Sequence, residues 1–313
     1  MTTHRVVVTG GILFGLLVAL ATAPLWSPAI GLGPSALPAG GAAVMIASGY
    51  RINVVDEGAG PAVMLIHGLP GSAHDWDPLP KQLVAAGFRV VRYDRVGYGH
   101  SDRRANDGEH RLEVNAAELM GLVSALRLES PILVGWSYGG GVALRAAADD
   151  PGRVAALLLV GSMGPSTDMG GLPAVGRVVE PLRRWGIASG FPARLGIRLF
   201  GRTFFSGAFP ESWTDHALAV VASPGALHTW TVEAVHTDPG AIRPERVRVP
   251  VTIVHGSLDR IAPLATADDL HRRLRTSELV TVAGGSHMLP NTHAALIVEK
   301  VRELDARRRS STP

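Results

Sequence analysis

The segment from Gly135 to Gly139, which reads Gly-Trp-Ser-Tyr-Gly, constrains the fold of this chain more than any other feature. It follows an apolar run at residues 131–134 that is typical of a buried strand. It precedes an alanine-rich run at 140–148 that is typical of a helix. A strand that turns so sharply into a helix needs glycine beside the serine, because larger side chains would block the turn. We therefore predict that Ser137 stands exposed at the end of a strand as a nucleophile.

An aspartate after a later strand is the predicted acid. A lone serine is a weak nucleophile at neutral pH, so a base must take its proton and an acid must orient that base. Asp259 follows the apolar run 251–255, which predicts a buried strand. Asp268 and Asp269 are the alternative acids, but the run 264–275 predicts a helix that would place them on its solvated face. We predict that Asp259 is the acid.

A histidine in a glycine-rich loop is the predicted base. The run 278–282 predicts another strand, and the loop that follows it ends in His287. The order of serine, acid and histidine along the chain is also the order expected after a nucleophile of this kind. His271 and His293 lie in predicted helices, where a surface or packing role is the expected one.

The loop after the predicted strand 62–66 reads His-Gly-Leu-Pro-Gly at residues 67–71. Backbone N–H groups in such a loop can point at the negative charge that develops on a carbonyl oxygen under attack. We predict that the backbone N–H groups of Leu69 and Tyr138 form this oxyanion hole, since one follows the His-Gly turn and the other follows the nucleophile. The alternative is an ordinary tight turn at residues 67 and 68.

Four segments in this order resemble the α/β-hydrolase superfamily over residues 43–304. They are His67 to Gly71, Asp94 to Asp102, Gly135 to Gly139, and Gly256 to Asp259 together with Gly285 to His287. The resemblance implies an α/β fold with a mostly parallel eight-stranded sheet, flanking helices and a helical cap inserted after the sixth strand. Within it, the Asp94 to Asp102 loop is expected to be architectural.

The predicted cap covers about residues 164–248 and concentrates large apolar side chains. Most of these should pack the cap on the core, and a minority should line a pocket for an apolar acyl or alkyl group. The aromatic residues concerned are Trp185, Phe191, Phe200, Phe204, Phe205, Phe209, Trp213 and Trp230. A small, apolar, ester-like molecule is therefore the expected substrate.

The residues at the nucleophile position and after the predicted base distinguish among the enzyme classes of this superfamily. Haloalkane dehalogenases and soluble epoxide hydrolases use aspartate where this chain has Ser137, and carbon–carbon bond hydrolases usually carry tryptophan where it has Met288. We therefore predict a serine hydrolase that cleaves a carboxylic ester through an acyl-enzyme. The alternatives are a carbon–carbon bond hydrolase, a perhydrolase or acyltransferase with the same triad, and a non-catalytic ligand-binding protein.

A long uncharged, mostly apolar segment lies near the amino terminus. Residues 6–26 contain no charged residue, and Arg5 precedes them. A run of about twenty such residues matches a bilayer core, whereas the apolar part of a signal peptide is usually shorter. We predict that residues 1–26 are a signal anchor that spans the cell membrane through residues 6–26, with the catalytic domain on the outer side. A signal peptide cleaved after Ala23, which would give a secreted or periplasmic protein, is the alternative.

Composition completes the predicted organisation. Residues 27–42 are rich in proline and glycine and predict a linker, and residues 305–313 predict a basic disordered tail. The chain has no cysteine, which excludes disulfides and thiolate metal sites, and its His, Asp and Glu residues show no metal-ligand spacing. We predict no cofactor, no metal, no nucleic-acid binding and no obligate protein partner.

Overall fold

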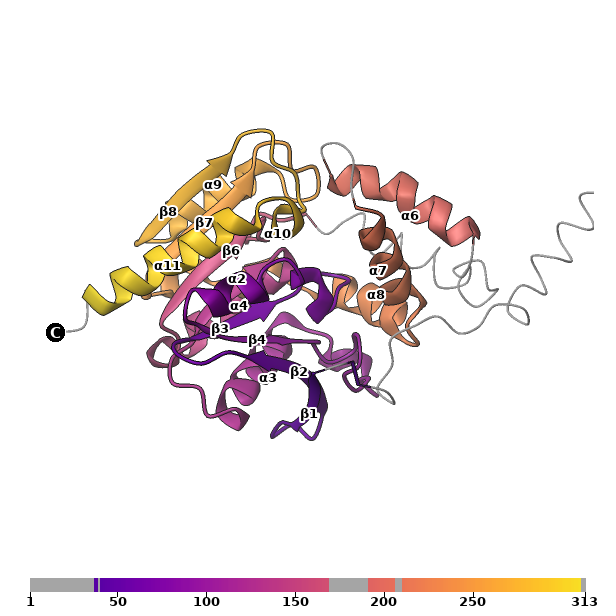
Figure 1. Ribbon diagram of the computed structural model, residues 1–313, viewed down its shortest axis with the longest axis horizontal. Coiled ribbons are helices and arrows are strands. Elements are labelled where there is room, and N and C mark those ends of the chain that lie inside the picture. Colours follow the sequence, from indigo (N-terminus) through magenta and orange to yellow (C-terminus); the bar gives the residue numbers. More distant parts are fainter. Residues whose placement is uncertain (1–36, 39, 169–190, 206–209, 311–313) are drawn as a thin grey trace, which may run out of the picture.

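The computed structural model contains one eight-stranded sheet with helices on both faces (Figure 1). It describes residues 37–38, 40–168, 191–205 and 210–310. The strands lie in the order β1-β2-β4-β3-β5-β6-β7-β8. Their bounds are β1 Gly41–Met45, β2 Arg51–Glu57, β3 Ala62–Ile66, β4 Arg89–Tyr93, β5 Ile132–Trp136, β6 Ala156–Val160, β7 Val251–Gly256 and β8 Ser277–Val282.

Six of these strands are parallel, and β1 and β2 form an antiparallel edge. Parallel strands are joined by crossovers that place helices over both faces, so their sequences are apolar without interruption. β5 and β6 show this, because every one of their residues is buried. The predicted fold class, a mostly parallel eight-stranded sheet flanked by helices, is confirmed.

The sheet separates two apolar cores because successive strand residues point to opposite faces. The helices of the two layers are α2 Pro80–Ala85, α3 Leu112–Ala125, α4 Tyr138–Asp149, α9 Leu264–Arg273, α10 Leu289–Thr292 and α11 Ala294–Ser310. In β3, Met64 and Ile66 belong to the core under α3 and α4, whereas Val63 and Leu65 belong to the core under α2 and α11. Short 3-10 helices join them at η1 Ala73–Trp76, η2 Asp107–Glu109, η3 Pro151–Arg153, η4 Pro239–Ile242 and η5 Pro244–Arg246.

Three further helices lie between β6 and β7 along the chain, within the range predicted for the cap. They are α6 Phe191–Phe204, α7 Glu211–Ala222 and α8 Ala226–His236, and Figure 1 shows them together beside the sheet. We call these three helices the inserted helices.

The loops after β5, β7 and β8 leave the same edge of the sheet, since these strands are parallel. The three predicted triad residues lie in those loops.

The carboxyl end differs from its prediction. The sequence predicts disorder from residue 305 onward, but α11 continues to Ser310. Asp305 is buried and pairs with Arg308 at 2.8 Å and Arg309 at 2.6 Å, one turn further on. These pairs explain why the basic run continues the helix, because carboxylates and guanidinium groups spaced three or four residues apart stabilise a helix.

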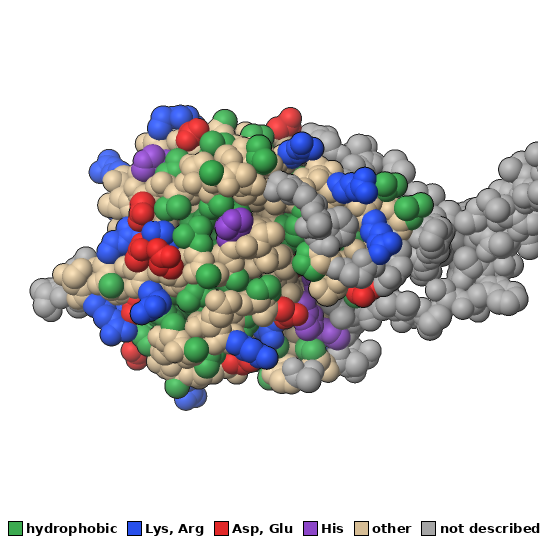
Figure 2. Space-filling view, turned by 45° about the horizontal axis from the view of Figure 1, so that its top comes forward, with side chains coloured by type: hydrophobic (Ala, Val, Ile, Leu, Met, Phe, Trp, Pro, Cys, Tyr) green, Lys and Arg blue, Asp and Glu red, His purple; other side chains and the backbone are tan. Residues whose placement is uncertain are grey.

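The predicted anchor at residues 6–26 and most of the predicted linker lie outside the described residues. Among the residues that the structure does describe, none belongs to a helix with both the length and the apolar character needed to cross a bilayer. Over the face drawn in Figure 2, basic and acidic side chains are interspersed with apolar ones. Ion pairs occur among the described surface residues, such as Arg89 with Asp56 at 2.6 Å.

Candidate active site

Ser137 occupies the turn between β5 and α4 in a strained backbone conformation. Its φ of 55° and ψ of −120° are unfavourable for a residue with a side chain. Backbone hydrogen bonds hold the turn: the Ser137 N–H donates to the Val160 carbonyl at 3.0 Å, and the Ser137 carbonyl accepts from Gly140 and Met163. The side chain of Ser137 is half-buried at the end of the strand. This is the strand-turn-helix geometry that the sequence predicts.

The glycines around Ser137 are required by close backbone contacts. A Cβ on Gly135 would lie 2.5 Å from the carbonyl oxygen of Gly139, and a Cβ on Gly139 would collide with the carbonyl oxygen of Ile66. The helix and the neighbouring strand can therefore approach the turn only where side chains are absent.

Asp259 and His287 are brought together by the loops after β7 and β8. The His287 Nδ1 lies 2.7 Å from Asp259 Oδ2, and both side chains are buried. Asp259 Oδ1 accepts hydrogen bonds from the backbone N–H groups of Ile261 and Ala262 at 2.9 and 2.8 Å. Burial would raise the pKa of Asp259, but His287 and the hydrogen bond from the Ala262 N–H outweigh it and lower that pKa. An ionised Asp259 keeps the proton on His287 Nδ1, which leaves Nε2 to act as a base.

Trp136, the residue directly before Ser137, links this turn to His287. The indole Nε1 of Trp136 donates to the carbonyl oxygen of His287 at 2.9 Å, and the two rings are 5.3 Å apart between centroids. No hydrogen bond joins the Ser137 hydroxyl to His287 in the described part of the chain. Such contacts often tighten only when substrate binds. The sequence predicts no role for Trp136, since no local signal points to a partner 151 residues away.

His255 supports the acid through the neighbouring turn and is likewise not predicted from the sequence. Its Nε2 lies 2.7 Å from the carbonyl oxygen of Ala262, the residue whose N–H binds Asp259, and 3.7 Å from Asp259 Oδ2. Burial lowers the pKa of His255, so the imidazole is neutral and donates to that carbonyl. It thereby fixes the turn that presents Asp259.

The loop after β3 lies directly against Ser137. A Cβ on Gly68 would be 3.2 Å from the Ser137 Cβ, so a side chain at this position would push the loop and the nucleophile apart by a few tenths of an ångström. In the part of the chain that the structure describes, no protein group accepts a hydrogen bond from the backbone N–H of Leu69 or Tyr138. Both predicted oxyanion donors therefore have no acceptor among the described residues, and the residue before Leu69 lies against Ser137.

The end of α6 packs against the predicted base. The Phe204 ring lies 5.9 Å from the His287 ring, and Phe205 and Trp213 are 5.2 Å apart in the adjoining core, all measured between centroids. The surroundings of the imidazole are therefore apolar on this side. Trp230 is buried in α8. The other aromatic side chains predicted for the cap, Trp185, Phe191, Phe200 and Phe209, lie outside the described side chains.

The architectural prediction for the Asp94 to Asp102 loop agrees with its contacts. Asp94 accepts hydrogen bonds from the Ala73 N–H at 2.7 Å and from the His100 N–H at 2.8 Å. Ser101 Oγ donates to the Asp94 carbonyl at 2.6 Å. These groups tie the loop after β4 to the loop after β3. Within the described residues, no cluster of His, Asp and Glu side chains could hold a metal ion.

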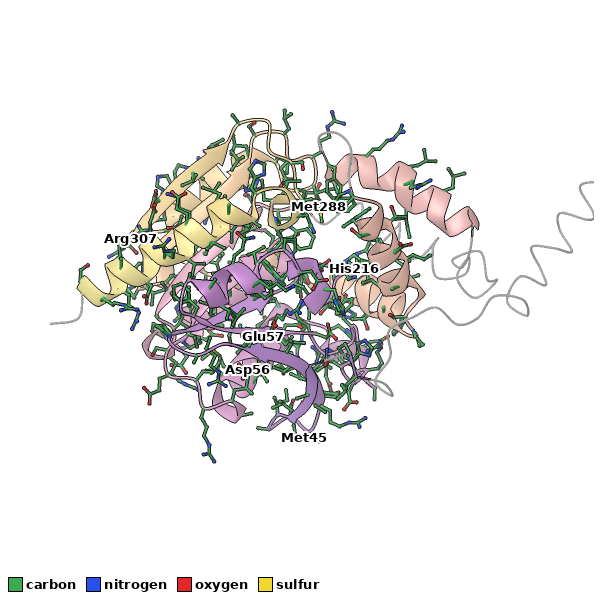
Figure 3. All side chains as sticks on the ribbon, viewed as in Figure 1. Met45, Asp56, Glu57, His216, Met288 and Arg307 are labelled. Atoms are coloured by element: carbon green, nitrogen blue, oxygen red, sulfur yellow. The ribbon has the colours of Figure 1, made fainter. Side chains whose placement is uncertain are left out.

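A histidine–carboxylate pair joins the inserted helices to the loop after β3. His216 of α7, labelled in Figure 3, lies with Nε2 2.8 Å from Asp75 Oδ1, and Asp75 Oδ2 accepts from the Ser72 N–H. Burial opposes protonation of His216, but the charge and hydrogen bond of Asp75 outweigh it and raise the pKa of the imidazole. Asp77 and Asp94 act in the same direction.

This pair predicts a pH-dependent contribution to stability. A histidine whose pKa is raised by folding stabilises the fold below its unfolded value of about 6.5, and this stabilisation is lost as pH rises through the raised pKa. We expect His216→Gln to lower the free energy of unfolding by about 1 kcal/mol near pH 6 and by less near pH 9. Urea unfolding at several pH values measures the difference. In an Asp75→Asn background the same substitution should have no pH-dependent effect, and a constant loss in both backgrounds would contradict the assignment.

The sequence profile of the α/β hydrolase fold matches residues 61–294 of the chain. The chain belongs to the α/β-hydrolase family. This α/β hydrolase is 31% identical over 281 residues to the 2-hydroxymuconate semialdehyde hydrolase of Pseudomonas sp. (strain CF600), an alignment that covers 84% of the chain and 94% of the relative. It is 29% identical over 253 residues to the non-heme chloroperoxidase of Streptomyces lividans, covering 76% and 89% of the two chains.

Solved structures show the same fold. The α/β hydrolase superimposes on the esterase EaEST from Exiguobacterium antarcticum with a TM-score of 0.73 and 24% sequence identity, over 85% of this chain and 99% of the esterase. The relatives differ in the reactions that their names describe, so family membership alone assigns no substrate.

Proposed function

We propose that this α/β hydrolase cleaves carboxylic esters with an apolar acyl or alkyl group through an acyl-enzyme intermediate. The observation that carries the proposal is a serine in a strained strand-turn-helix position beside a buried Asp259–His287 hydrogen bond of 2.7 Å. The two unpaired backbone N–H groups of Leu69 and Tyr138 support it further. Together these groups supply a nucleophile, a base, an acid and an oxyanion hole.

Each group has a defined step in this reaction. Ser137 Oγ attacks the ester carbonyl carbon while His287 Nε2 takes the hydroxyl proton, and the carbonyl electron pair moves onto the oxygen facing Leu69 and Tyr138. Collapse breaks the carbon–oxygen bond to the alcohol, which leaves with the proton from His287. A water molecule, deprotonated by His287, then attacks the acyl-enzyme and releases the acid and Ser137. Asp259 stabilises the imidazolium in both halves.

Carbon–carbon bond hydrolysis is the second candidate, and the likeness to 2-hydroxymuconate semialdehyde hydrolase favours it. Met288 argues the other way, because carbon–carbon bond hydrolases usually have tryptophan directly after the histidine. Met288, labelled in Figure 3, is buried directly before α10 and belongs to the same apolar core as Trp136. We therefore keep ester hydrolysis as the proposed function.

A covalent probe and a substrate panel test the proposal. The protein should react once with a fluorophosphonate and should hydrolyse p-nitrophenyl esters, with kcat/KM varying with acyl length because the surroundings of His287 are apolar. The panel includes 2-hydroxymuconate semialdehyde, and a peracid assay with acetate and hydrogen peroxide. Turnover of the semialdehyde far above every ester would replace the proposal with carbon–carbon bond cleavage. Absence of both labelling and turnover would indicate a ligand-binding protein.

A further inference from the structure

A buried ion pair joins the inserted helices to the core behind the candidate oxyanion hole. Arg95, in the loop after β4, lies with Nη1 2.8 Å from Glu233 Oε1 and Nη2 3.2 Å from Glu233 Oε2, and both side chains are at most 2% exposed. Glu233 belongs to α8 and also accepts from Tyr98 at 2.8 Å and Asn115 at 2.9 Å. Burial would raise the pKa of Glu233, but Arg95 outweighs it and lowers that pKa, so the pair is ionised.

The same guanidinium contacts the loop that faces Ser137. Arg95 Nη2 donates to the carbonyl oxygen of Gly68 at 2.9 Å, and the backbone N–H of Arg95 donates to Nε2 of His67 at 2.9 Å. His67 Nε2 is therefore an acceptor, which places the proton of the neutral ring on Nδ1. That Nδ1 lies 3.0 Å from the Gly68 carbonyl and donates to it. Burial lowers the pKa of His67 well below its usual value, so the ring stays neutral.

The Gly68 carbonyl thus accepts two buried hydrogen bonds, and this fixes more than the carbonyl. The carbonyl of Gly68 and the N–H of Leu69 belong to one planar peptide group, which is trans. In a trans peptide the oxygen and the hydrogen point in opposite directions. Donors that hold the Gly68 oxygen on the buried side therefore hold the Leu69 N–H on the other side. The loop cannot rotate this N–H away without breaking both bonds.

Arg95 also touches the second predicted donor residue. The Arg95 guanidinium lies over the ring of Tyr138, 4.6 Å from its centroid, and over that of Tyr98 at 4.8 Å. The ring of Tyr138 is thereby held at the start of α4, next to Ser137. One buried cation contacts the peptide group of one oxyanion donor and the side chain of the other.

We propose that Arg95 is a positioning residue that orients the oxyanion hole, and that Glu233 holds Arg95 in place from α8. This inference rests on the proposed function, because an oxyanion hole matters only for attack on a carbonyl. Correct seating of α8 is then required for full oxyanion stabilisation. A merely structural ion pair would stabilise the fold and leave the catalytic steps unchanged.

The test replaces the pair with apolar residues. Removing one partner would leave a buried charge, whereas replacing both with residues of similar volume is often tolerated. The variant is Arg95→Met/Glu233→Leu, which deletes the hydrogen bond to Gly68. The matched control is Arg104→Met/Glu118→Leu, since Arg104 and Glu118 form another buried pair at 2.7 Å that does not contact Gly68. Arg95→Lys is made as well, because lysine keeps the charge against Glu233 but lacks the planar fork.

The readouts separate orientation from folding. We measure kcat and KM for p-nitrophenyl acetate, inhibition by 1,1,1-trifluorobutan-2-one, which forms an oxyanion with an active-site serine, and thermal unfolding. One oxyanion donor contributes about 10²–10³ to kcat. We therefore expect the Arg95 variants to lose about 10-fold to 100-fold in kcat, with little change in KM. Their affinity for the trifluoroketone should fall by a similar factor. The control should keep its kcat. Covalent labelling by fluorophosphonate should reach full stoichiometry in all variants, though more slowly in those at Arg95.

The outcomes distinguish this inference from the proposed function. Wild-type protein that neither labels nor turns over esters would overturn the proposed function. If the wild type is active, a folded Arg95→Met/Glu233→Leu variant with wild-type kcat and trifluoroketone affinity would overturn the positioning role. If the Arg95→Met/Glu233→Leu variant does not fold, the test rests on Arg95→Lys. An unchanged kcat in Arg95→Lys would likewise overturn the positioning role. Equal kcat losses in the control pair would show that the loss is not specific to the hydrogen bond from Arg95 to Gly68, and would overturn the positioning role.

Discussion

Replacing Ser137 by alanine should reduce ester hydrolysis by about 10³-fold or more and leave the protein folded. The hydroxyl is the only group of the described site that can form the acyl-enzyme. Its loss removes no hydrogen bond of the described structure, because Ser137 Oγ makes none there. Alanine also keeps the Cβ, so the backbone strain at φ 55° is unchanged. We expect kcat for p-nitrophenyl acetate to fall to the residual level and fluorophosphonate labelling to vanish.

Thermal unfolding of Ser137→Ala supplies the control, with an expected midpoint close to that of the wild type. Stoichiometric labelling of the variant would place the nucleophile elsewhere. Retained labelling and retained turnover together would remove Ser137 from the mechanism.

The second large effect is expected from Asp259→Asn, which should lower kcat by about 10³-fold to 10⁴-fold. The asparagine oxygen can still accept the N–H groups of Ile261 and Ala262, so the turn should survive. Its amide NH₂ would face His287 Nδ1, however, where the wild-type carboxylate accepts a hydrogen bond at 2.7 Å. The imidazole would then carry its proton on Nε2 and could not act as a base toward Ser137. Initial rates with p-nitrophenyl acetate measure the loss.

Asp268→Asn is the matched control for this prediction. Asp268 is an exposed carboxylate on α9 and the alternative acid, so its substitution should leave kcat within about 2-fold of the wild type. A harmless Asp259→Asn combined with a large loss in Asp268→Asn would transfer the acid role. Because Asp259 is the aspartate that contacts His287, we expect the loss in Asp259→Asn.

Much of the candidate site could be predicted from the sequence because its residues follow strands directly. Ser137, Asp259 and His287 each come within five residues of the end of an apolar run, and parallel strands bring their carboxyl ends to one edge of the sheet. Glycine at positions 135 and 139 is also a local signal, since a tight turn limits the side chains at fixed offsets. Apolar runs and turn chemistry therefore predicted the strands that carry the candidate residues and the triad itself, whereas the eight-stranded fold class came from the resemblance of four segments to the α/β-hydrolase superfamily.

Contacts between distant elements were decided only by the tertiary structure. Nothing near Trp136, Arg95 or His216 in the chain indicates that their partners are His287, Glu233 and Asp75, because a hydrogen bond between elements depends on packing rather than on spacing. The helical end of α11 differs from these cases, because Asp305 lies three and four residues before Arg308 and Arg309, and that local spacing was available in the sequence. Local sequence determines which elements form and where their ends lie. The packing of those elements determines which polar groups are buried together, and therefore how the candidate site is held.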